Sequence, residues 1–206
     1  MVAQNQAQAI AVAAGAPAEV TLFEPAEPVY ALGRRAQGPQ GRAQIADALA
    51  ACQANGIAIV DVDRGGLGTL HAPGQIVAFL AVPCSRLHAR RLCAELLSGI
   101  ARLAQEQGAE ARSDLGDDVG VWIADAKLAS LGLRVRDEVA HHGIALNYAV
   151  DRRLARGLVL CGKPLTTFAN LRDHALDQNV DLAFWAQNLA QHWRLATPST
   201  AAPEIA

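Results

Sequence analysis

A glycine-rich segment between two predicted strands is the first place where this sequence indicates chemistry. Residues 64–75 hold four glycines and one proline, a composition that predicts neither a helix nor a regular strand. The segment also carries Arg64, His71 and Gln75, which are a cation, an imidazole and an amide. Such a segment by itself is also typical of a turn-rich connector between strands. Because glycines let a backbone approach a ligand closely, the three polar side chains among them favour a ligand-binding loop instead. It lacks the Gly-Lys-Ser/Thr ending of a phosphate-binding loop, and no helix follows it as in a dinucleotide-binding turn.

A lysine, a cysteine and two polar strand residues form a second group. Lys127 follows a predicted turn, Cys161 lies at a turn before Gly162, and His142 and Asn147 lie between them in the chain. The other cysteines fall in helix or strand patterns, which is typical of small core residues: Cys52, Cys84 and Cys93. Cys161 differs from them because it lies at a predicted turn.

Five segments, in this order along the chain, resemble the octanoyltransferases of lipoate biosynthesis. They are Pro28-Val29-Tyr30-x-Leu32-Gly33-Arg34, Arg64-Gly65-Gly66-x-x-Thr69-x-His71-x-Pro73-Gly74-Gln75, Gly120-Val121-Trp122 followed by Lys127-Leu128-Ala129-Ser130-Leu131-Gly132-Leu133-Arg134, His142-Gly143-x-Ala145-Leu146-Asn147, and Cys161-Gly162. The resemblance covers residues 20–165, and five matches in order are far more specific than any one alone. Ala72 stands where members of this family usually carry glycine.

The resemblance implies both a fold and a reaction. The family belongs to the biotin/lipoate ligase superfamily, which implies a single α+β domain with a mixed, largely antiparallel sheet flanked by helices. Its members move an octanoyl group from octanoyl-acyl-carrier protein to one lysine of a lipoyl domain, through an acyl-cysteine thioester. This is the activity of an octanoyl-[acyl-carrier-protein]:protein N-octanoyltransferase, the first step of endogenous protein lipoylation. The implied acceptors are the lipoyl domains of 2-oxoacid dehydrogenases and the glycine cleavage H protein, and no cofactor or metal is implied.

The resemblance also assigns roles to residues. The catalytic pair maps onto Cys161 and Lys127. The substrate-binding residues map onto Arg64, Gly65, Gly66, Thr69, His71, Gly74, Gln75, Ser130, Leu131, Gly132, His142, Gly143, Ala145 and Asn147. His71 and His142 would position groups or relay protons. A thiolate attacks a thioester and leaves again readily, so an acyl-cysteine divides the transfer into two easier steps. A nearby ammonium favours that thiolate, and a neutral lysine can later accept a proton from the incoming amine.

Three other functions compete with this interpretation. An ATP-dependent lipoate or biotin ligase of the same superfamily would need a phosphate-holding loop and would use no cysteine nucleophile. A catalytically silent module that binds lipoyl domains or acyl groups is the second alternative. A cysteine thioesterase or amidase is the third, and it would need a general-base histidine with an orienting carboxylate.

The elements that must position these residues follow from hydrophobic patterns and turn residues. Strands are predicted at 20–23, 29–32, 57–62, 76–82, 119–123, 127–135, 144–150 and 158–160, with the strand at 57–62 buried. Helices are predicted around 45–52, from Ser85 as N-cap to 108, and over 182–193. Loops are predicted at 38–41 and 109–118, and a turn at 141–143. Residues 1–18 form an Ala/Gln-rich N-terminal segment, 19–195 the catalytic domain and 196–206 a flexible tail. Strands and helices without strict alternation favour an α+β fold.

Composition limits the remaining classes. The chain has 206 residues, of which 51% are hydrophobic, enough for one well-packed domain. A formal net charge of −2 and only 4% aromatic residues argue against nucleic acid as a partner. The sequence has no apolar run long enough for a membrane span and no cationic start typical of a secretory signal. Four cysteines without a Cys-x-x-Cys pair favour a reducing, cytoplasmic location.

Overall fold

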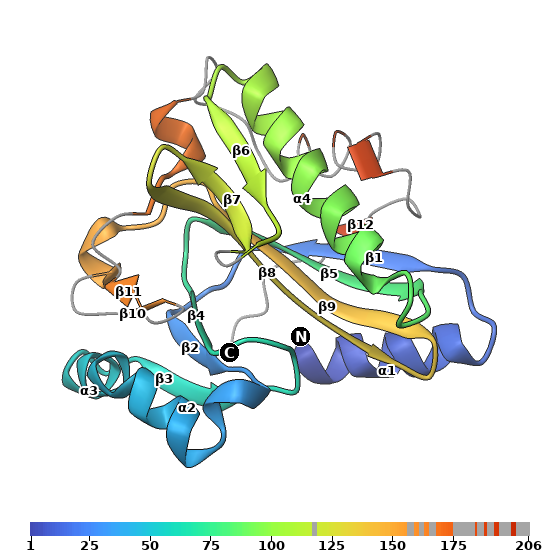
Figure 1. Ribbon diagram of the computed structural model, residues 1–206, viewed down its shortest axis with the longest axis horizontal. Helices are drawn as coiled ribbons and strands as arrows, with labels where there is room; N and C mark the ends of the chain where they lie inside the picture. The colour runs from blue at the N-terminus through green and yellow to red at the C-terminus, as the bar shows by residue number, and fades with distance from the viewer. Residues whose placement is uncertain are drawn as a thin grey trace.

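The computed structural model describes residues 1–116, 119–155, 159–160, 163–164, 168–174, 184, 188, 192–193 and 199–200. They form an α+β fold in which a large sheet and a small sheet face each other (Figure 1). The large sheet has the strand order β12-β1-β5-β9-β8-β7-β6. In that order its strands are Ser199–Thr200, Glu19–Phe23, Gln75–Pro83, Val139–Asn147, Ala126–Arg136, Gly120–Ile123 and Ala111–Asp114. All neighbours pair antiparallel except β12 and β1, which are parallel, so the predicted mixed and largely antiparallel sheet is confirmed.

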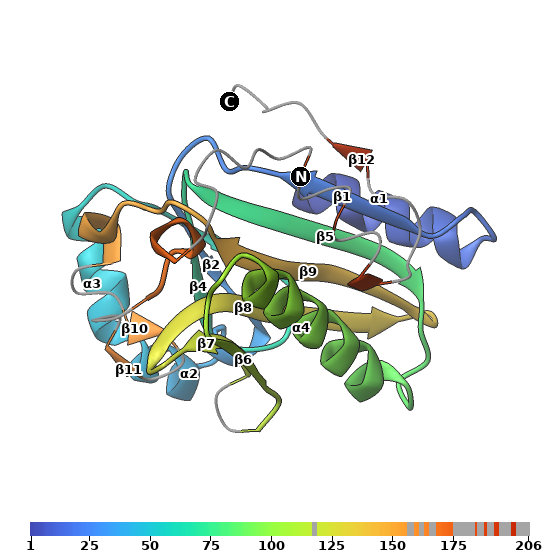
Figure 2. The same ribbon diagram turned by 90° about the horizontal axis from the view of Figure 1, so that it is seen from above.

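Alternation along β5 divides the large sheet into two faces. Leu80 and its even-numbered neighbours join the main core under helix α4 (Ala89–Glu106), whose buried stripe includes Leu92, Leu96, Ile100 and Leu103. Val77 and Phe79 point to the other face, where helix α1 (Val2–Ala13) packs on β5 and β9. Figure 2 shows the sheet between these two helices. Every β5 residue except Pro83 is buried, as expected of a strand covered on both faces.

The small sheet has the order β3-β2-β4, from Ala58–Asp61, Val29–Leu32 and Gly68–His71. Strand β2 runs parallel to β3 and antiparallel to β4. One face packs against helix α3 (Ala46–Ala54), with Tyr30, Leu70 and Cys52 in a second core. Helix α2 (Pro39–Gln44) and the 3-10 turn η1 (Arg34–Ala36) complete this layer. Its other face looks toward β5, β9 and β8 of the large sheet.

Short elements connect the two layers. Strands β10 (Val159–Leu160) and β11 (Lys163–Pro164) pair antiparallel, and β10 lies against β4. The 3-10 turns η2 (Arg152–Ala155) and η3 (Leu171–Asp173) flank an isolated bridge between Phe168 and Lys127. No helix in the described part of the chain is both long and apolar enough to cross a membrane.

The structure corrects several predicted elements. The glycine-rich segment contains strand β4, because pairing with β2 overrides its low strand propensity. Strand β3 is largely exposed rather than buried, since it forms the edge of the small sheet. Residues 39–41 belong to α2 and residues 111–114 form β6, where loops were expected. Helix α4 begins after His88, and Ser85 hydrogen-bonds to the His88 ring instead of capping the helix.

The hairpin between β8 and β9 also differs from the prediction. Its two-residue loop is Asp137–Glu138, both with positive φ, as in a type I′ turn. No glycine marks this turn, so the sequence pattern placed it at 141–143 instead. His141 and His142 therefore lie within β9, close to the site described below. Of the predicted C-terminal helix, Trp193 is described and buried, with its indole N–H donating to the Leu96 carbonyl at 3.0 Å. Most of that predicted helix, including Leu182, Trp185 and Leu189, lies outside the described residues.

Candidate active site

A pocket of about 280 Å³ lies between the two sheets. One wall comes from the small sheet through Val29, Ala31, Val60, Thr69 and His71. The other wall comes from the large sheet through Val77, Phe79, Ser130, Gly132 and Ala145. Met1 and Val2, at the start of α1, and residues 24–27 also line it. The lining is mostly apolar with a few polar groups, which is typical of a small-molecule site.

The structure brings many of the predicted substrate-binding residues to this pocket: Arg64, Thr69, His71, Ser130, Leu131, Gly132, His142, Gly143 and Ala145. Others support the pocket without lining it: Gly65, Gly66, Gly74, Gln75 and Asn147. Cys161 lies outside the described residues, so its contacts are not described. Lys127 is buried and is not among the residues that line the pocket, and its surroundings are described below.

Arg64 joins the glycine-rich segment to both sheets. Its buried guanidinium donates to the Ala31 carbonyl and to Thr69 Oγ1, each at 2.8 Å, and to the Gly65 carbonyl at 2.7 Å. A Cβ atom on Gly132 would lie 2.7 Å from Arg64 Cδ, so glycine at that position makes room for the arginine. The sequence suggested that Arg64 contacts substrate, but the structure gives it a large part in holding the pocket together.

Gly74 of this segment is required by the backbone conformation and by close backbone contacts. Gly74 has φ +86°, its N–H donates to Glu24 Oε1 at 2.7 Å, and its carbonyl accepts from Tyr148 and Ala149. A side chain at Gly74 would collide with the Ala149 backbone, so substitution there damages folding as well as binding. Ala72 is buried and is not among the residues with positive φ, which explains why alanine fits where the family usually has glycine.

A chain of side-chain amides fixes the backbone at Lys127. Gln75 Nε2 donates to the Leu70 carbonyl at 3.0 Å and to Asn147 Oδ1 at 2.8 Å. Asn147 Nδ2 then donates to the Lys127 carbonyl at 3.2 Å, which also accepts from the Ala169 N–H at 3.0 Å. The chain ties β4, β5, β9 and β8 together beside the lysine. Gln75 and Asn147 thus have a positioning function that the sequence pattern did not separate from substrate binding.

The Lys127 side chain is buried beside an aromatic ring. Only 6% of the residue is exposed, and Nζ lies 4.8 Å from the centroid of the Trp122 ring. Within the part of the chain that the structure describes, no carboxylate lies within ion-pair distance of this ammonium. A buried cation that no anion neutralises can stabilise a thiolate or an oxyanion that forms beside it.

His71 is a neutral pocket residue at physiological pH. Burial lowers its pKa, and the charges of Arg64 and His142 lower it further to about 4, against a smaller opposite effect of Gln75. His71 as a whole is partly exposed, but its ring atom Nδ1 is buried. The burial of the ring, which carries the titrating nitrogens, determines the direction of the pKa shift. Neither His71 Nδ1 nor Gln75 Oε1 has a hydrogen-bond partner of good geometry in the described structure. The imidazole can therefore form a hydrogen bond with a ligand in the pocket.

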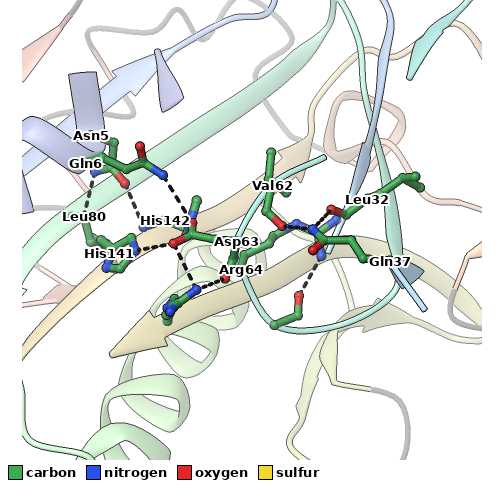
Figure 3. Close-up of polar contacts among 12 residues, drawn as sticks. Asn5, Gln6, Leu32, Gln37, Val62, Asp63, Arg64, Leu80, His141 and His142 are labelled. Atoms are coloured by element: carbon green, nitrogen blue, oxygen red, sulfur yellow. Dashed lines mark hydrogen bonds and ion pairs between the residues drawn. The ribbon is translucent and has the colours of Figure 1, made fainter. Parts of the chain in front are cut away.

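The sequence analysis missed a charged cluster around Asp63, the residue just before the glycine-rich segment. Figure 3 shows the Asp63 carboxylate among imidazoles and a guanidinium. His142 Nε2 lies 2.5 Å from Oδ1, Arg134 lies 3.1 Å from Oδ2, and His141 Nε2 lies 3.6 Å from Oδ2. The adjacency of Asp63 to Arg64 was the available signal, but nothing in the sequence indicates these partners.

Backbone geometry at His142 makes this cluster possible. Neighbouring strand residues normally point to opposite faces, but His142 has φ +63°, and both histidine rings approach Asp63. The buried amide of Asn5 on α1 supports the distortion, because it accepts from the His142 N–H and donates to the Leu80 carbonyl, each at 2.8 Å (Figure 3). Burial lowers the pKa of His142 despite its hydrogen bond to Asp63.

Asp63 remains ionised in this cluster. Burial alone would raise its pKa, but the hydrogen bond and charge of His142, together with His141 and Arg134, lower it. The ligating atoms of Asp63, His141 and His142 lie within 4.8 Å of one another, a grouping that could hold a metal ion. Arg134 already balances the carboxylate, so we interpret the cluster as an ion-pair network that joins α1, the glycine-rich segment and β8–β9.

The described cysteines behave as core residues. Cys52 and Cys84 are buried, and Cys93 is half-buried. Burial raises the pKa of all three thiols, which disfavours the nucleophilic thiolate form. This agrees with their interpretation from the sequence.

Comparisons with known proteins identify the class. Residues 3–194 match the family described as the lipoyl protein ligase A/B catalytic domain, and the chain belongs to this family. It is 36% identical to the octanoyltransferase of Methylococcus capsulatus over 155 residues, which cover 74% of this chain and 70% of the relative. It is 35% identical to the octanoyltransferase of Magnetococcus marinus over 175 residues, which cover 81% and 77%. The predicted relationship to octanoyltransferases is thereby confirmed.

Solved structures support the fold. A lipoate protein ligase from the lipoylation system of Thermoplasma acidophilum superimposes with a TM-score of 0.64 at 15% identity, over 97% of this chain and 83% of the other. Lipoate-protein ligase A bound with ATP gives a TM-score of 0.65 at 13% identity, over 97% and 85%. At such low identity the likeness establishes the fold alone.

Proposed function

We propose that the protein transfers an octanoyl group from octanoyl-acyl-carrier protein to a lysine of a lipoyl domain, through an acyl thioester on Cys161. The observation that carries the proposal is the buried ammonium of Lys127, which has no carboxylate within ion-pair distance among the described residues and lies on β8 three residues before Ser130 of the apolar pocket. The acceptors are lipoyl domains of 2-oxoacid dehydrogenases and the glycine cleavage H protein. The family relationship and the five sequence segments support these substrates.

The pocket suits a medium-length acyl chain. An octanoyl group has about seven carbons beyond its carbonyl, and each buried CH₂ contributes about 0.8 kcal/mol. Complete burial would contribute about 5–6 kcal/mol before the entropic cost of binding is subtracted. The apolar side chains of Val77, Phe79 and Ala145 on the large sheet, opposite Val29 and Ala31, offer such burial.

Described segments on both sides of Cys161 lie near this chemistry. Strand β10, which ends one residue before Cys161, lies against β4 with its pocket residues Thr69 and His71. Phe168, on the other side, forms a bridge with Lys127. These contacts support a role for Cys161 together with Lys127, while the raised pKa values of the other cysteines disfavour them as nucleophiles.

In the proposed first half-reaction the resting pair is a Cys161 thiolate and a Lys127 ammonium. The thiolate attacks the thioester carbonyl of the donor, forming a bond from sulfur to carbon and breaking the bond to the carrier's sulfur. The carrier's thiolate leaves and takes a proton from Lys127, so the lysine becomes neutral. Backbone N–H groups near the glycine-rich segment would stabilise the transient oxyanion.

In the second half-reaction the neutral amine of the acceptor lysine attacks the acyl-cysteine. A carbon–nitrogen bond forms, the carbon–sulfur bond to Cys161 breaks, and Lys127 accepts the proton that the amine loses. The Cys161 thiolate and the Lys127 ammonium are thereby restored. The amide chain through Gln75 and Asn147 holds the Lys127 backbone in one place during both steps.

One observation favours a hydrolase as a second candidate. His142 with Asp63 provides the histidine and orienting carboxylate that a cysteine hydrolase would require. However, His142 and Asn147 are five residues apart on β9, or about 17 Å at strand spacing, so this pair lies far from the Lys127 end of the site. Acyl transfer to water in the absence of an acceptor would favour the hydrolase.

Intact mass spectrometry after mixing with octanoyl-acyl-carrier protein, without ATP, tests the proposal. We expect one octanoyl adduct, mapped by peptide analysis to Cys161, absent in Cys161→Ala and discharged by addition of a lipoyl domain. Cys84→Ala is the matched control and should load normally. An adduct on another cysteine, or a product that forms only with ATP, would contradict the mechanism.

A further inference from the structure

An irregularity in the pairing of β7 with β8 determines which residue faces Lys127. Val121 pairs with Ala129, whereas Trp122 pairs with Lys127, so the register skips Leu128. A bulge of this kind re-aims side chains and is common beside active sites. Directly opposite residues of antiparallel strands project to the same face, so the bulge makes Trp122 the cross-strand neighbour of Lys127.

Gly120 completes a slot for the lysine side chain. A Cβ atom at Gly120 would lie 2.7 Å from Lys127 Cε and 3.4 Å from Nζ. The lysine therefore extends along a strand that has no side chain at this point, and its ammonium ends 4.8 Å from the centroid of the Trp122 ring. The backbone of Lys127 is held by Asn147 and Ala169, and its head by the indole.

We propose that Trp122 is a positioning residue that holds the Lys127 ammonium in place for acyl transfer. The inference rests on the role of Lys127 in the proposed function. The face of an indole carries negative electrostatic potential and attracts a cation, most strongly where water is excluded. Lysine has a flexible four-carbon stem, so a contact at its head restricts many alternative positions.

An aromatic ring has an advantage over a carboxylate at this place. It attracts the ammonium without contributing a full negative charge, so the lysine keeps its ability to stabilise a thiolate. Arg112 lies 6.0 Å from the same ring, but this exposed arginine also pairs with Asp114 at 3.9 Å. Lys127 is therefore the closer and more buried of the two cations on the indole.

Fluorinated tryptophans, incorporated only at position 122, test this electrostatic role. Successive fluorines weaken the negative potential of the ring face while its shape changes little. We expect kcat for octanoyl transfer to fall stepwise with the number of fluorines, by about 2- to 30-fold across the series, with KM for the donor unchanged. Trp122→Phe should lie between wild type and Trp122→Leu.

The buried Trp193 provides the matched control, because its indole N–H donates to the Leu96 carbonyl. Fluorination at Trp193 should leave kcat unchanged. The proposal would be overturned if kcat did not change across the fluorinated tryptophans at position 122 and if activity fell only in Trp122→Leu, in proportion to lost thermal stability. Trp122 would then contribute packing alone. If Lys127→Arg transfers at the wild-type rate, Lys127 is not the base and the role on which this inference rests fails. If the wild-type protein neither loads Cys161 from octanoyl-acyl-carrier protein nor transfers to a lipoyl domain, the proposed function itself fails. If Lys127→Arg is inactive and the fluorine series is flat, only the positioning role fails.

Discussion

Two polar clusters, joined to different parts of strand β9 through His142 and Asn147, differ in how their buried charge is balanced. In one cluster, Lys127 is a buried cation whose head contacts an aromatic ring and whose backbone is fixed by Asn147. In the other cluster, Asp63 is an anion that contacts Arg134 and His142 at short distance. Strand β9 contributes to both clusters and keeps them apart.

The difference indicates which cluster is prepared for chemistry. Leaving a buried charge unbalanced costs stability, so such an arrangement persists where the charge is used. A charge that is balanced and hydrogen-bonded contributes to architecture instead. We therefore assign the reaction to the Lys127 cluster and the attachment of α1 and the glycine-rich segment to the Asp63 cluster. Each prediction below could break or sharpen this division.

The largest expected effect is on the rate of Lys127→Arg. Arginine keeps a positive charge but does not give up its proton, so it can assist thiolate attack but cannot accept the proton of the incoming amine. We expect Cys161 still to load, although more slowly because arginine does not protonate the departing carrier thiolate, while transfer to the lipoyl domain falls about 10²- to 10⁴-fold, the usual contribution of a general base. Single-turnover assays of loading and transfer measure the two steps separately. Equal losses in both steps would contradict the assigned base.

Part of the candidate site could be predicted from the sequence, whereas the Asp63 cluster and strand β4 were missed for physical reasons. The residues of the motif segments that line the pocket could be predicted because motifs record chemistry that is local in the chain, whereas the catalytic role of Lys127 stays a prediction. The Asp63 cluster was missed because its members come from three separate segments and meet only through the strained backbone at His142. Strand β4 was missed because tertiary pairing with β2 decided its structure against its glycine content.

Acid should destabilise the protein through its neutral, buried histidines. The pKa of His71 is about 4 when folded and about 6.5 when unfolded, so the unfolded chain binds the proton more readily between these values. The unfolding free energy is therefore unaffected by His71 above pH 6.5 and decreases by about 3 kcal/mol as the pH falls toward 4. His142, whose pKa is also lowered, adds a loss of the same sign.

Urea unfolding at a series of pH values measures this loss. His71→Gln should flatten the dependence between pH 6.5 and 4, because glutamine does not titrate. A dependence that survives in His71→Gln but disappears in His142→Gln would place the acid-sensitive group in the Asp63 cluster.

The smallest of these effects is expected for Asp63→Asn, which tests the architectural cluster directly. The substitution removes the charge that balances Arg134 and weakens the acceptor of the His142 hydrogen bond, while it preserves shape. Hydrogen bonds to charged groups contribute about 1.5–3 kcal/mol, and the 29% exposure of this side chain reduces the effect, so we expect a loss of about 2 kcal/mol in unfolding free energy.

Asp61→Asn is the matched control, because Asp61 is 60% exposed and pairs with Arg42 only at 3.8 Å, an arrangement that contributes little. Loading of Cys161 by folded Asp63→Asn should remain near wild type, since the cluster lies about 17 Å along β9 from the Lys127 cluster. Loss of loading without loss of stability would instead give Asp63 and His142 a part in the chemistry and remove the distinction between the two clusters.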